Sequence, residues 1–396
     1  MRILLGAFGD PGHAFPMLAL GEALVARGHH VALETWRRWE EATQAGGMTF
    51  APAPEYQVFP TRERPLKPYE AAVRAAAQTR TVVRSLAPDA VVSDILTPAP
   101  ALAAELEGVP VATLVPHVHP HLPPGFPPYA IGARPPRTAL GRALWRATDP
   151  LIARGLEQGR REYNECRARL GLGPLPWVHT GMSHSLTLVA TLPQLEYPRD
   201  WPGWVRVVGP LMWEPPGERV APPEGEGPVV LVAPSTAQDP EHRLLRASLA
   251  GLAGERVRVI ATYNGRVPDP PVPVPANAVL VPWLSYSQTM PACDLVVAHG
   301  GHGTLVRALA CGCPVVLSPA GGDMAENAAR VDHAGLGVRL PRRFCTPRGV
   351  RLAVRRALRR RDLRPRAARA AAWIATHDGG ARAAAELEAW VSRETP

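Results

Sequence analysis

The sequence predicts an α/β fold of two doubly wound domains, each built on a parallel sheet. At 396 residues the chain is longer than one domain of common size. Short apolar runs alternate with helical patterns along both halves, as in parallel sheets covered on both faces. A segment rich in Pro, Gly and Glu interrupts this alternation. The chain therefore divides into an N-terminal domain, a linker, a C-terminal domain and a last helix able to pack back on the first domain, at 1–213, 214–227, 228–375 and 376–396.

The first domain opens on a buried strand at 2–8, a loop, a helix with Pro16 in its first turn and Gly28 at its end, and a strand at 30–35. This unit is the parallel crossover from which doubly wound sheets are built. Residues 51–69 are rich in Pro and are expected to be irregular. Further helices are expected at 69–86, 99–106 and 139–170, and further strands at 89–94, 111–115, 186–190 and 205–208.

The second domain repeats the plan without a clear sequence repeat. Strands are expected at 229–233, 257–262, 279–281, 295–298, 315–317 and 337–340. Helices are expected at 241–253, near Ser287, at 304–311, at 324–333 and within the Arg-rich segment 347–396. In both domains the polar loops after the strands share the carboxyl edge of a sheet, where α/β proteins bind their ligands.

Composition excludes several classes of protein. Hydrophobic residues make up 46% and charged residues 20%, which is typical of a globular chain and not of a disordered one. No apolar run approaches the ~20 residues of a membrane span, so no stable membrane insertion is expected. The basic and apolar residues 1–6 are too short a run for a signal peptide, and a cytoplasmic location is expected. The five cysteines suit reduced thiols, and Cys311 and Cys313 are expected to pack and not to bind a metal.

The net charge of +9 raises the question of an anionic partner. Arginines concentrate between 355 and 369, with no aromatic residue among them. A solvated helix face explains this cluster better than nucleic acid or an anionic membrane, because single-stranded sites combine charge with aromatic stacking. No nucleic-acid partner is therefore expected. Monomer and homodimer both stay open.

The most informative stretch is 296–304, Val-Val-Ala-His-Gly-Gly-His-Gly-Thr. It has the pattern of a strand, a glycine-rich turn and the start of a helix. The glycines let the backbone approach a ligand, and the helix start offers free N–H groups at its positive dipole end. Such a turn is predicted to bind phosphate, with His299 and Thr304 as flanking donors.

His13 and Asp94 each follow a buried strand of the first domain. A carboxylate bonded to one imidazole nitrogen fixes the tautomer and raises the basicity of the other nitrogen. Strands of one parallel sheet would bring the two side chains to one edge, although their separation in sequence does not reveal it. The alternative is that His13 caps its own helix and Asp94 binds loop amides.

Several motifs together resemble the family 1 glycosyltransferases, and most closely the bacterial antibiotic and macrolide enzymes. Gly-His-Ala-Phe-Pro at 12–16 is similar to the family's opening G-H-x-x-P. The turn at 299–304 matches the signature H-G-G-x-G-T, which continues through Ala-Leu-Ala-Cys-Gly-Cys-Pro at 308–314 and Gly-Asp-Met-Ala-Glu-Asn-Ala at 322–328. Val-Pro-Trp-Leu at 281–284 also fits. The resemblance implies the GT-B architecture, in which two Rossmann-like doubly wound domains face each other across a cleft and bind an acceptor and a nucleotide-activated sugar.

The resemblance implies roles for the matching residues. In the first domain, His13 matches the general base that removes the proton of the acceptor hydroxyl, and Asp94 matches the carboxylate that supports it. In the second domain, His299 and the amides at the helix start match the diphosphate site. The donor-binding residues implied in this way are Ser235, Thr236, Trp283, Leu284, His299, Gly301, Gly303, Thr304, Asp323 and Met324.

Some of these assignments carry an alternative. Trp283 would stack on the base, with the Leu284 backbone bonded to the pyrimidine edge, or would simply belong to the core. Asp323 would bond sugar hydroxyls, although Glu326 three positions on also gives it the pattern of a capping box. The loop at 235–236 lacks the glycine usual in the family, so which of its two hydroxyls touches phosphate stays open.

Met324 departs from the family pattern. Members that use glucose often carry Gln here, and a thioether cannot donate to a sugar hydroxyl. An apolar contact would suit a sugar that lacks a hydroxyl, so a dTDP-deoxysugar donor stands as a hypothesis beside a UDP-sugar. His302 fills the variable position of the signature and is given no catalytic role.

A hydrophobic acceptor is expected on the first domain. The Pro-rich loop 116–137 is long enough to be functional, and with the segment before residue 69 it supplies a candidate acceptor wall. Alternating histidines in this loop make a poor rigid metal site, and no Asp-x-Asp motif lies near the phosphate turn. No metal or other cofactor is therefore expected. The candidate acceptor-binding residues are Tyr56, Phe59, His117, Phe126 and Tyr129.

The predicted activity is an inverting, metal-independent single displacement onto a polyketide, macrolide or aromatic aglycone. A lipid-linked sugar transferase or a nucleotide-sugar epimerase of the same architecture is an alternative. A non-catalytic nucleotide-binding helper is another, which an intact His13 and Asp94 disfavour. Attack by oxygen, nitrogen or carbon and the identity of the sugar stay open.

Overall fold

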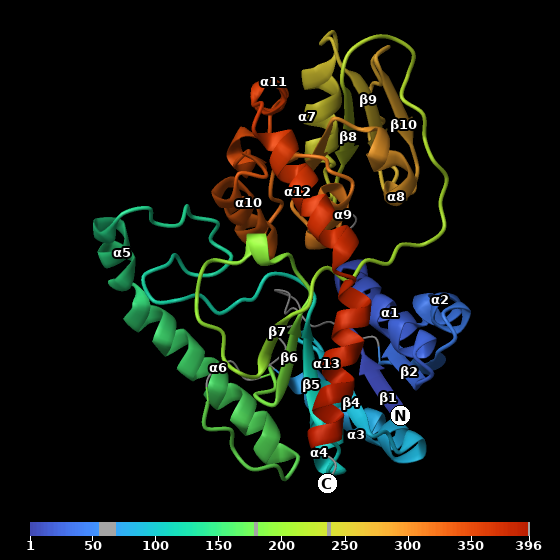
Figure 1. Ribbon diagram of the computed structural model, residues 1–396, viewed down its shortest axis with the longest axis vertical. Coiled ribbons are helices and arrows are strands. Elements are labelled where there is room, and N and C mark those ends of the chain that lie inside the picture. Colours follow the sequence, from blue (N-terminus) through green and yellow to red (C-terminus); the bar gives the residue numbers. More distant parts are fainter. Residues whose placement is uncertain (55–68, 178–180, 236–238, 395–396) are drawn as a thin grey trace.

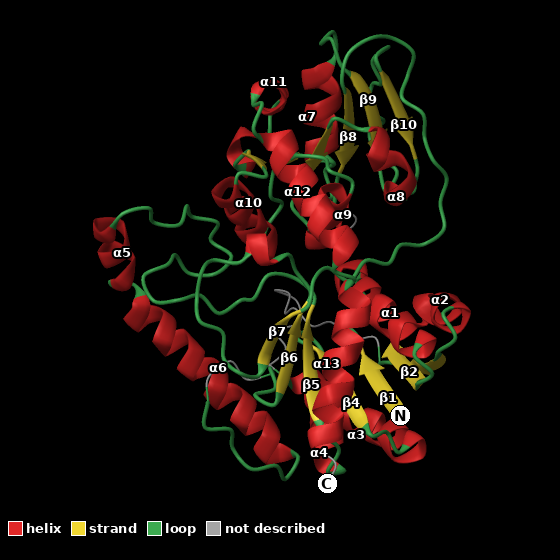
Figure 2. Ribbon diagram, in the orientation of Figure 1, coloured by secondary structure: helices red, strands yellow, loops and turns green. Residues whose placement is uncertain are grey.

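Two parallel sheets, one in each half of the chain, form the two lobes of the computed structural model, which describes residues 1–54, 69–177, 181–235 and 239–394 (Figures 1 and 2). The first sheet has the order β3-β2-β1-β4-β5-β6-β7. Its order reverses between β1 and β4, which is the switch point where such sheets bind ligands. The strands are β1 (Arg2–Gly6), β2 (His30–Thr35), β3 (Thr49–Pro52), β4 (Ala90–Asp94), β5 (Val111–Val115), β6 (Leu186–Val189) and β7 (Val205–Val207).

The helices of the first lobe are α1 (Pro11–Ala26), α2 (Glu40–Ala45), α3 (Glu70–Leu86), α4 (Pro98–Leu106), α5 (Ala139–Arg146) and α6 (Asp149–Arg169). The single helix predicted at 139–170 is wrong. It is divided into α5 and α6, with Pro150 in the first turn of α6, where its ring cannot continue a preceding helix. The short strand β3 lies partly in a segment predicted to be irregular. Figure 1 shows α5 and the start of α6 extending away from the sheet.

The second sheet has the order β10-β9-β8-β11-β12-β13, again with parallel pairing throughout and a reversal between β8 and β11. Its strands are β8 (Val229–Ala233), β9 (Arg258–Thr262), β10 (Ala278–Val281), β11 (Leu295–Ala298), β12 (Val315–Leu317) and β13 (Gly337–Arg339). Its helices are α7 (Arg243–Leu252), α8 (Tyr286–Thr289), α9 (His302–Ala310), α10 (Asp323–Ala334), α11 (Pro347–Arg359) and α12 (Leu363–Thr376). The predicted α/β fold of two doubly wound sheets is confirmed.

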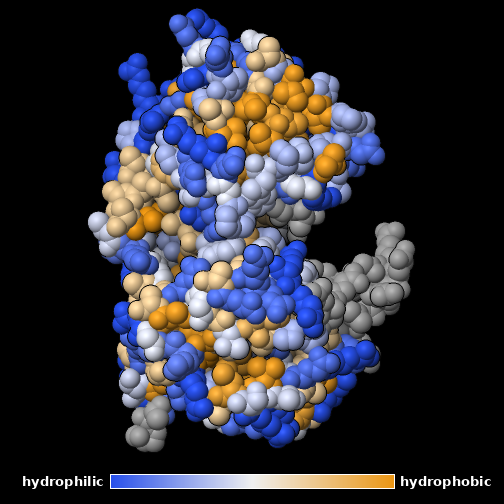
Figure 3. All heavy atoms as spheres, turned by 90° about the vertical axis from the view of Figure 1, so that its right-hand side faces the viewer, coloured by the Kyte–Doolittle hydropathy of each residue, from blue (hydrophilic) through white to orange (hydrophobic). Residues whose placement is uncertain are grey.

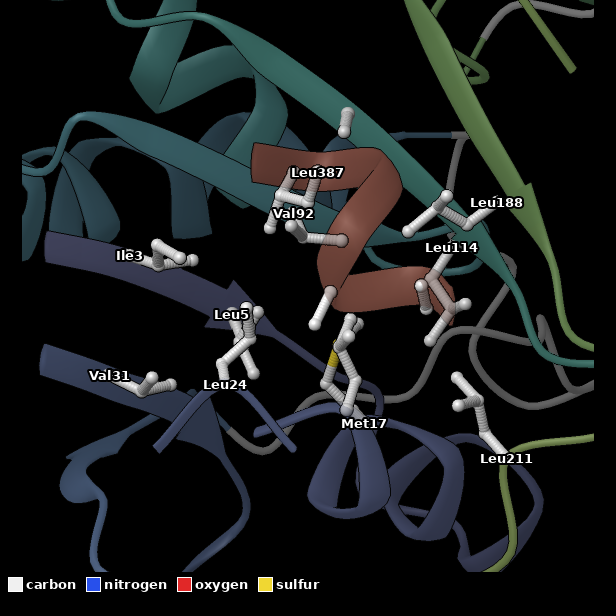
Figure 4. Packing of buried hydrophobic residues seen from close by; sticks show 14 of the residues in the cluster. Ile3, Leu5, Met17, Leu24, Val31, Val92, Leu114, Leu188, Leu211 and Leu387 are labelled. Atoms are coloured by element: carbon white, nitrogen blue, oxygen red, sulfur yellow. The ribbon is translucent and has the colours of Figure 1, made fainter. Parts of the chain in front are cut away.

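The last helix, α13 (Gly379–Glu394), leaves the second lobe and packs against α1 of the first (Figure 1). Leu387 and Trp390 are buried in the same cluster as Leu5 and Leu114, as Figure 4 shows for the leucines. Arg27 donates to Glu388 at the surface of this contact. The chain therefore crosses between the lobes twice, and Figure 3 shows a notch between them on one side of the molecule.

Candidate active site

His13 and Asp94 are brought together by the strand order of the first sheet. β1 pairs with β4, so the loop after β1 and the end of β4 meet at one carboxyl edge. Nδ1 of His13 donates to Oδ1 of Asp94 over 2.8 Å. The Thr97 hydroxyl donates to the other carboxylate oxygen over 3.4 Å. His13 is thus bonded to Asp94. It does not cap its own helix, because the N-cap residue of α1 is Asp10.

This pair is poised for proton transfer. Asp94 is 1% exposed and the His13 side chain 15%. Burial alone would lower the pKa of His13, but the charge and hydrogen bond of Asp94, aided by Asp323 and Asp10, raise it above its usual value. Because Nδ1 carries the hydrogen donated to the carboxylate, the lone pair of the neutral ring lies on Nε2. Nε2 can therefore accept a proton from a bound hydroxyl.

The predicted phosphate turn lies at the carboxyl edge of the second sheet, between β11 and α9. Gly300 has φ +91°, and a Cβ there would lie 2.9 Å from the carbonyl oxygen of Met324. A Cβ on Gly301 would lie 2.3 Å from Nε2 of His299. A Cβ on Gly303 would meet nothing within 4 Å. The turn is therefore tightly packed behind and open in front of the helix start, where Thr304 is half-buried.

His299 is held in one tautomer. Its Nδ1 donates to the carbonyl oxygen of Ala233 over 3.2 Å, because that oxygen can only accept. Burial lowers the pKa of His299, against the opposing effects of Ala233 and Asp323. The ring of the free protein is therefore neutral, and its Nε2 can donate to a phosphate only after it gains a proton.

The other predicted donor residues lie in loops after β8 and β10. Ser235 is buried beside the end of β8, and Thr236 lies outside the described residues. Trp283 is 38% exposed and Leu284 is buried in the core of the lobe. A ring as exposed as that of Trp283 is available for stacking, so the core interpretation does not hold for it. The roles of these residues stay predictions.

Asp323 begins α10. Its charge adds to the raised pKa of His13 and opposes the lowering of the pKa values of His117 and His299 by burial, so it lies near histidines of both lobes. The capping-box alternative is wrong, because Gly322 is the N-cap and Glu326 pairs with an arginine of the same helix. The neighbouring Met324 is 8% exposed, so most of its side chain is covered.

Comparisons with known proteins show what the chain is similar to. Residues 246–389 match the family model described as Erythromycin biosynthesis protein CIII-like, C-terminal domain. The chain is 29% identical to 4'-demethylrebeccamycin synthase of Lentzea aerocolonigenes over 93% of this chain and 94% of the relative. It is 29% identical to O-mycaminosyltylonolide 6-deoxyallosyltransferase of Streptomyces fradiae over 100% of this chain and 99% of the relative. The structure of glycosyltransferase VinC in complex with dTDP superposes with a TM-score of 0.70 at 19% identity, over 99% of this chain and 100% of that one.

The C-terminal part of the chain thus resembles a domain of antibiotic biosynthesis, its full-length relatives act by name in antibiotic pathways, and its fold is that of the GT-B glycosyltransferases. The resemblance read from the motifs is thereby confirmed. Within the part of the chain that the structure describes, no helix is both long and apolar enough to cross a bilayer. No group of three or more His, Cys, Asp or Glu side chains in the described residues is arranged to hold a metal ion.

Arg330 of α10 joins the two lobes from a fully buried position. Its guanidinium donates to Glu326 of the same helix over 2.8 Å and to Glu196 of the first lobe over 2.6 Å. It also donates to the backbone carbonyls of His119 and Leu195, over 3.0 and 3.2 Å. Sequence reasoning missed this residue, because a Glu four positions before an Arg is the usual pattern of an exposed helix pair.

His302 adds a second bond between the lobes. Its Nε2 donates over 3.2 Å to the carbonyl oxygen of Ala190, just after β6. Burial lowers the pKa of His302 to about 3, so the ring is neutral. The variable position of the signature therefore supports the interface in this chain.

The loop 116–137 lies between the lobes. His117 packs edge-on to His13 with ring centroids 6.2 Å apart, and burial lowers its pKa. The Tyr129 hydroxyl lies 3.4 Å from Nδ1 of His117, and its ring packs on the core of the second lobe. Phe126 is 9% exposed and packs on Tyr197. These contacts place Tyr129 between the lobes and Phe126 against Tyr197 of the first lobe. The role of both residues in acceptor binding stays a prediction, as it does for His117.

Two of the predicted acceptor residues, Tyr56 and Phe59, lie outside the described residues.

A positioning residue that sequence reasoning missed is Asn264, which follows β9 with φ +50°. Its amide donates to the Pro234 carbonyl over 2.8 Å, and its carbonyl accepts from the Tyr286 hydroxyl over 3.1 Å. It thereby ties the loop after β8 to the start of α8. The Tyr-Asn-Gly turn at 263–265 was the available signal.

Proposed function

We propose that this protein transfers a deoxysugar from a dTDP-sugar to a hydroxyl group of a hydrophobic natural product, with inversion and without a metal. The observation that carries the proposal is the convergence of the His13–Asp94 pair with Asp323 of the other lobe. This proximity supports one site shared by the proposed acceptor base and the proposed donor-sugar residue. The name of one full-length relative, a 6-deoxyallosyltransferase, and a dTDP complex of another protein of this fold support the donor class.

The donor would lie on the second lobe. Its diphosphate would meet the start of α9 and His299, and its base would reach the exposed ring of Trp283. Asp323 would hold hydroxyls of the sugar. An aliphatic edge of Met324 suits a carbon without a hydroxyl, which favours a deoxysugar over glucose.

The acceptor hydroxyl would be bonded to Nε2 of His13. As its oxygen attacks the anomeric carbon, the bond from that carbon to the diphosphate breaks and the proton passes to Nε2. Asp94 stabilises the imidazolium formed, and the helix dipole with His299 stabilises the departing dTDP. The positive charge of these groups would stabilise the leaving diphosphate in the absence of a divalent cation. Attack opposite the leaving group inverts the anomeric configuration.

The test is a transfer assay with paired donors. Wild-type protein is supplied with dTDP-deoxysugars or UDP-glucose, a panel of polyketide and aromatic aglycones, and chelator. The proposal expects transfer from dTDP-deoxysugars and an anomeric configuration in the product, read by NMR coupling constants, opposite to that of the donor. Turnover with UDP-glucose far above that with every dTDP-deoxysugar would overturn the donor assignment. Retention of configuration would overturn the mechanism.

A further inference from the structure

A small cavity beside the predicted base contains a buried carboxyl group. The cavity measures about 20 Å³, which is room for about one water-sized group. Glu34, near the end of β2, lines it and is 3% exposed. It is the one ionisable residue among the described residues that line this cavity.

The cavity adjoins the predicted catalytic pair. It lies at the carboxyl edge of the first sheet, where β1, β2 and β3 end and α4 begins. Two of its lining residues also contact the pair. The ring of Phe8 lies edge-on to His13 with centroids 6.0 Å apart, and the hydroxyl of Thr97 donates to Asp94. The cavity is therefore separated from the pair by single side chains, and a ligand that extends past them would reach His13.

Only one of the two carboxyl oxygens of Glu34 has a hydrogen-bond partner among the described residues. Its Oε1 accepts from the Thr79 hydroxyl over 2.7 Å, and its Oε2 has no hydrogen-bond partner in the described structure. Burial raises the pKa of Glu34 to about 7, against the opposing effect of Thr79. The nearby Arg38 packs over the ring of Trp36 and donates to the Gly9 carbonyl, so its charge is used elsewhere.

The remaining surroundings are apolar or aromatic. An unpaired carboxylate in such a place is costly, and a cation that donates a hydrogen bond removes the cost. The edges and faces of nearby aromatic rings add to the attraction of a cation. The other walls of the cavity include Ala7, Trp36, Ala53, Pro54, Ala75 and Pro100.

We propose that this cavity is an acceptor subsite that receives a protonated amine, which donates to Oε2 of Glu34 while the apolar body of the acceptor extends toward His13. Glu34 then selects among hydrophobic acceptors for those that carry a basic amine. The size of the cavity admits the amine tip alone, so the rest of the molecule lies in the cleft. Calling the bound molecule an acceptor rests on the proposed function.

The test measures binding without any nucleotide sugar. The probes are 2-phenylethylamine and 2-phenylethanol, which share an apolar body and differ in charge. Saturable binding is followed by ligand-detected NMR in the full-length wild type, in Glu34→Gln and in the control Glu41→Gln, whose residue is exposed in the same lobe. The amine is expected to bind at least about tenfold more tightly than the alcohol, and Glu34→Gln is expected to remove that preference.

A second measurement does not depend on the variant folding well. The pKa of Glu34 is read in the wild type from its 13C-labelled carboxyl, with and without the amine. An ammonium partner stabilises the carboxylate, so the amine should lower this pKa by about one unit or more. The alcohol should leave it unchanged.

Three outcomes overturn the proposal: an amine that does not bind, an amine that binds wild type and Glu34→Gln alike, and an alcohol that binds as well as the amine. The last outcome would assign the cavity to neutral donors. Failure of sugar transfer in the donor assay would leave the amine-binding result unchanged. Only the interpretation of the bound amine as a sugar acceptor would then fail. The two hypotheses therefore fail separately.

Discussion

Replacing Arg330 with Met tests whether the two lobes are held together by a buried cation. The variant removes a side chain that is 0% exposed and leaves two carboxylates behind. Glu196 keeps Arg199 as a partner at 2.9 Å, whereas Glu326 loses its one ion pair among the described residues. Removing one partner of a buried pair costs about 3–5 kcal/mol. We therefore expect a loss of about 4 kcal/mol, most of it from Glu326.

The assay is thermal unfolding by calorimetry with the transfer rate measured in parallel. A loss of this size lowers the Tm of a unit of 150–250 residues by about 10 °C. The double variant Arg330→Met/Glu326→Gln should recover much of the loss, because it no longer buries an unpaired charge. Arg134→Met is the matched control, since its pair with Asp332 also joins the lobes but Arg134 is 71% exposed, and a surface pair contributes at most about 1 kcal/mol. A drop no larger than that of the control, or no recovery in the double variant, would refute the account of the interface.

Three further predictions concern the site itself. Asp94→Asn removes the charge that raises the pKa of His13, so the rising limb of the pH–rate profile should move to lower pH. The kcat should fall about 10²–10³-fold. A rising limb that does not move would count against the His13–Asp94 pair. Gly301→Ala places a methyl group against Nε2 of His299 and should weaken dTDP binding by calorimetry at least about tenfold, whereas Gly155→Ala, where a Cβ meets nothing within 4 Å, should not. Because burial lowers the pKa of His299 and an anion raises it, dTDP binding should take up a proton and strengthen by up to about tenfold per pH unit as pH falls. Calorimetry in buffers of different ionisation enthalpy checks this uptake, which His299→Gln should reduce.

The residues that sequence reasoning placed correctly follow from the geometry of parallel sheets. His13 and Asp94 are distant in sequence, yet each follows a strand, and adjacent parallel strands end at one edge. The same rule brought the turn at 299–304 and Ser235 to the edge of the second sheet. Local patterns were thus enough wherever function lies at the ends of neighbouring strands.

The missed residues owe their importance to contacts that no local pattern contains. Arg330 is buried only because loops of the other lobe close over it, and its spacing from Glu326 is that of an exposed pair. Glu34 interrupts a strand that otherwise reads as apolar, and its surroundings come from four separate elements. The loop 116–137 was assigned to the acceptor because it is long and rich in Pro, and no local pattern showed that Tyr129 packs on the core of the second lobe.

The most direct test of the central claim is single-turnover transfer by His13→Ala. His30→Ala, at the opposite end of the first sheet and exposed, is the matched control. The account predicts that transfer of a deoxysugar from its dTDP donor falls at least about 10²-fold in His13→Ala, while the Kd for dTDP, measured on the same preparation, stays within about twofold because the nucleotide is held by the other lobe. Transfer by His13→Ala at the wild-type rate would contradict the account, because the base would then lie elsewhere.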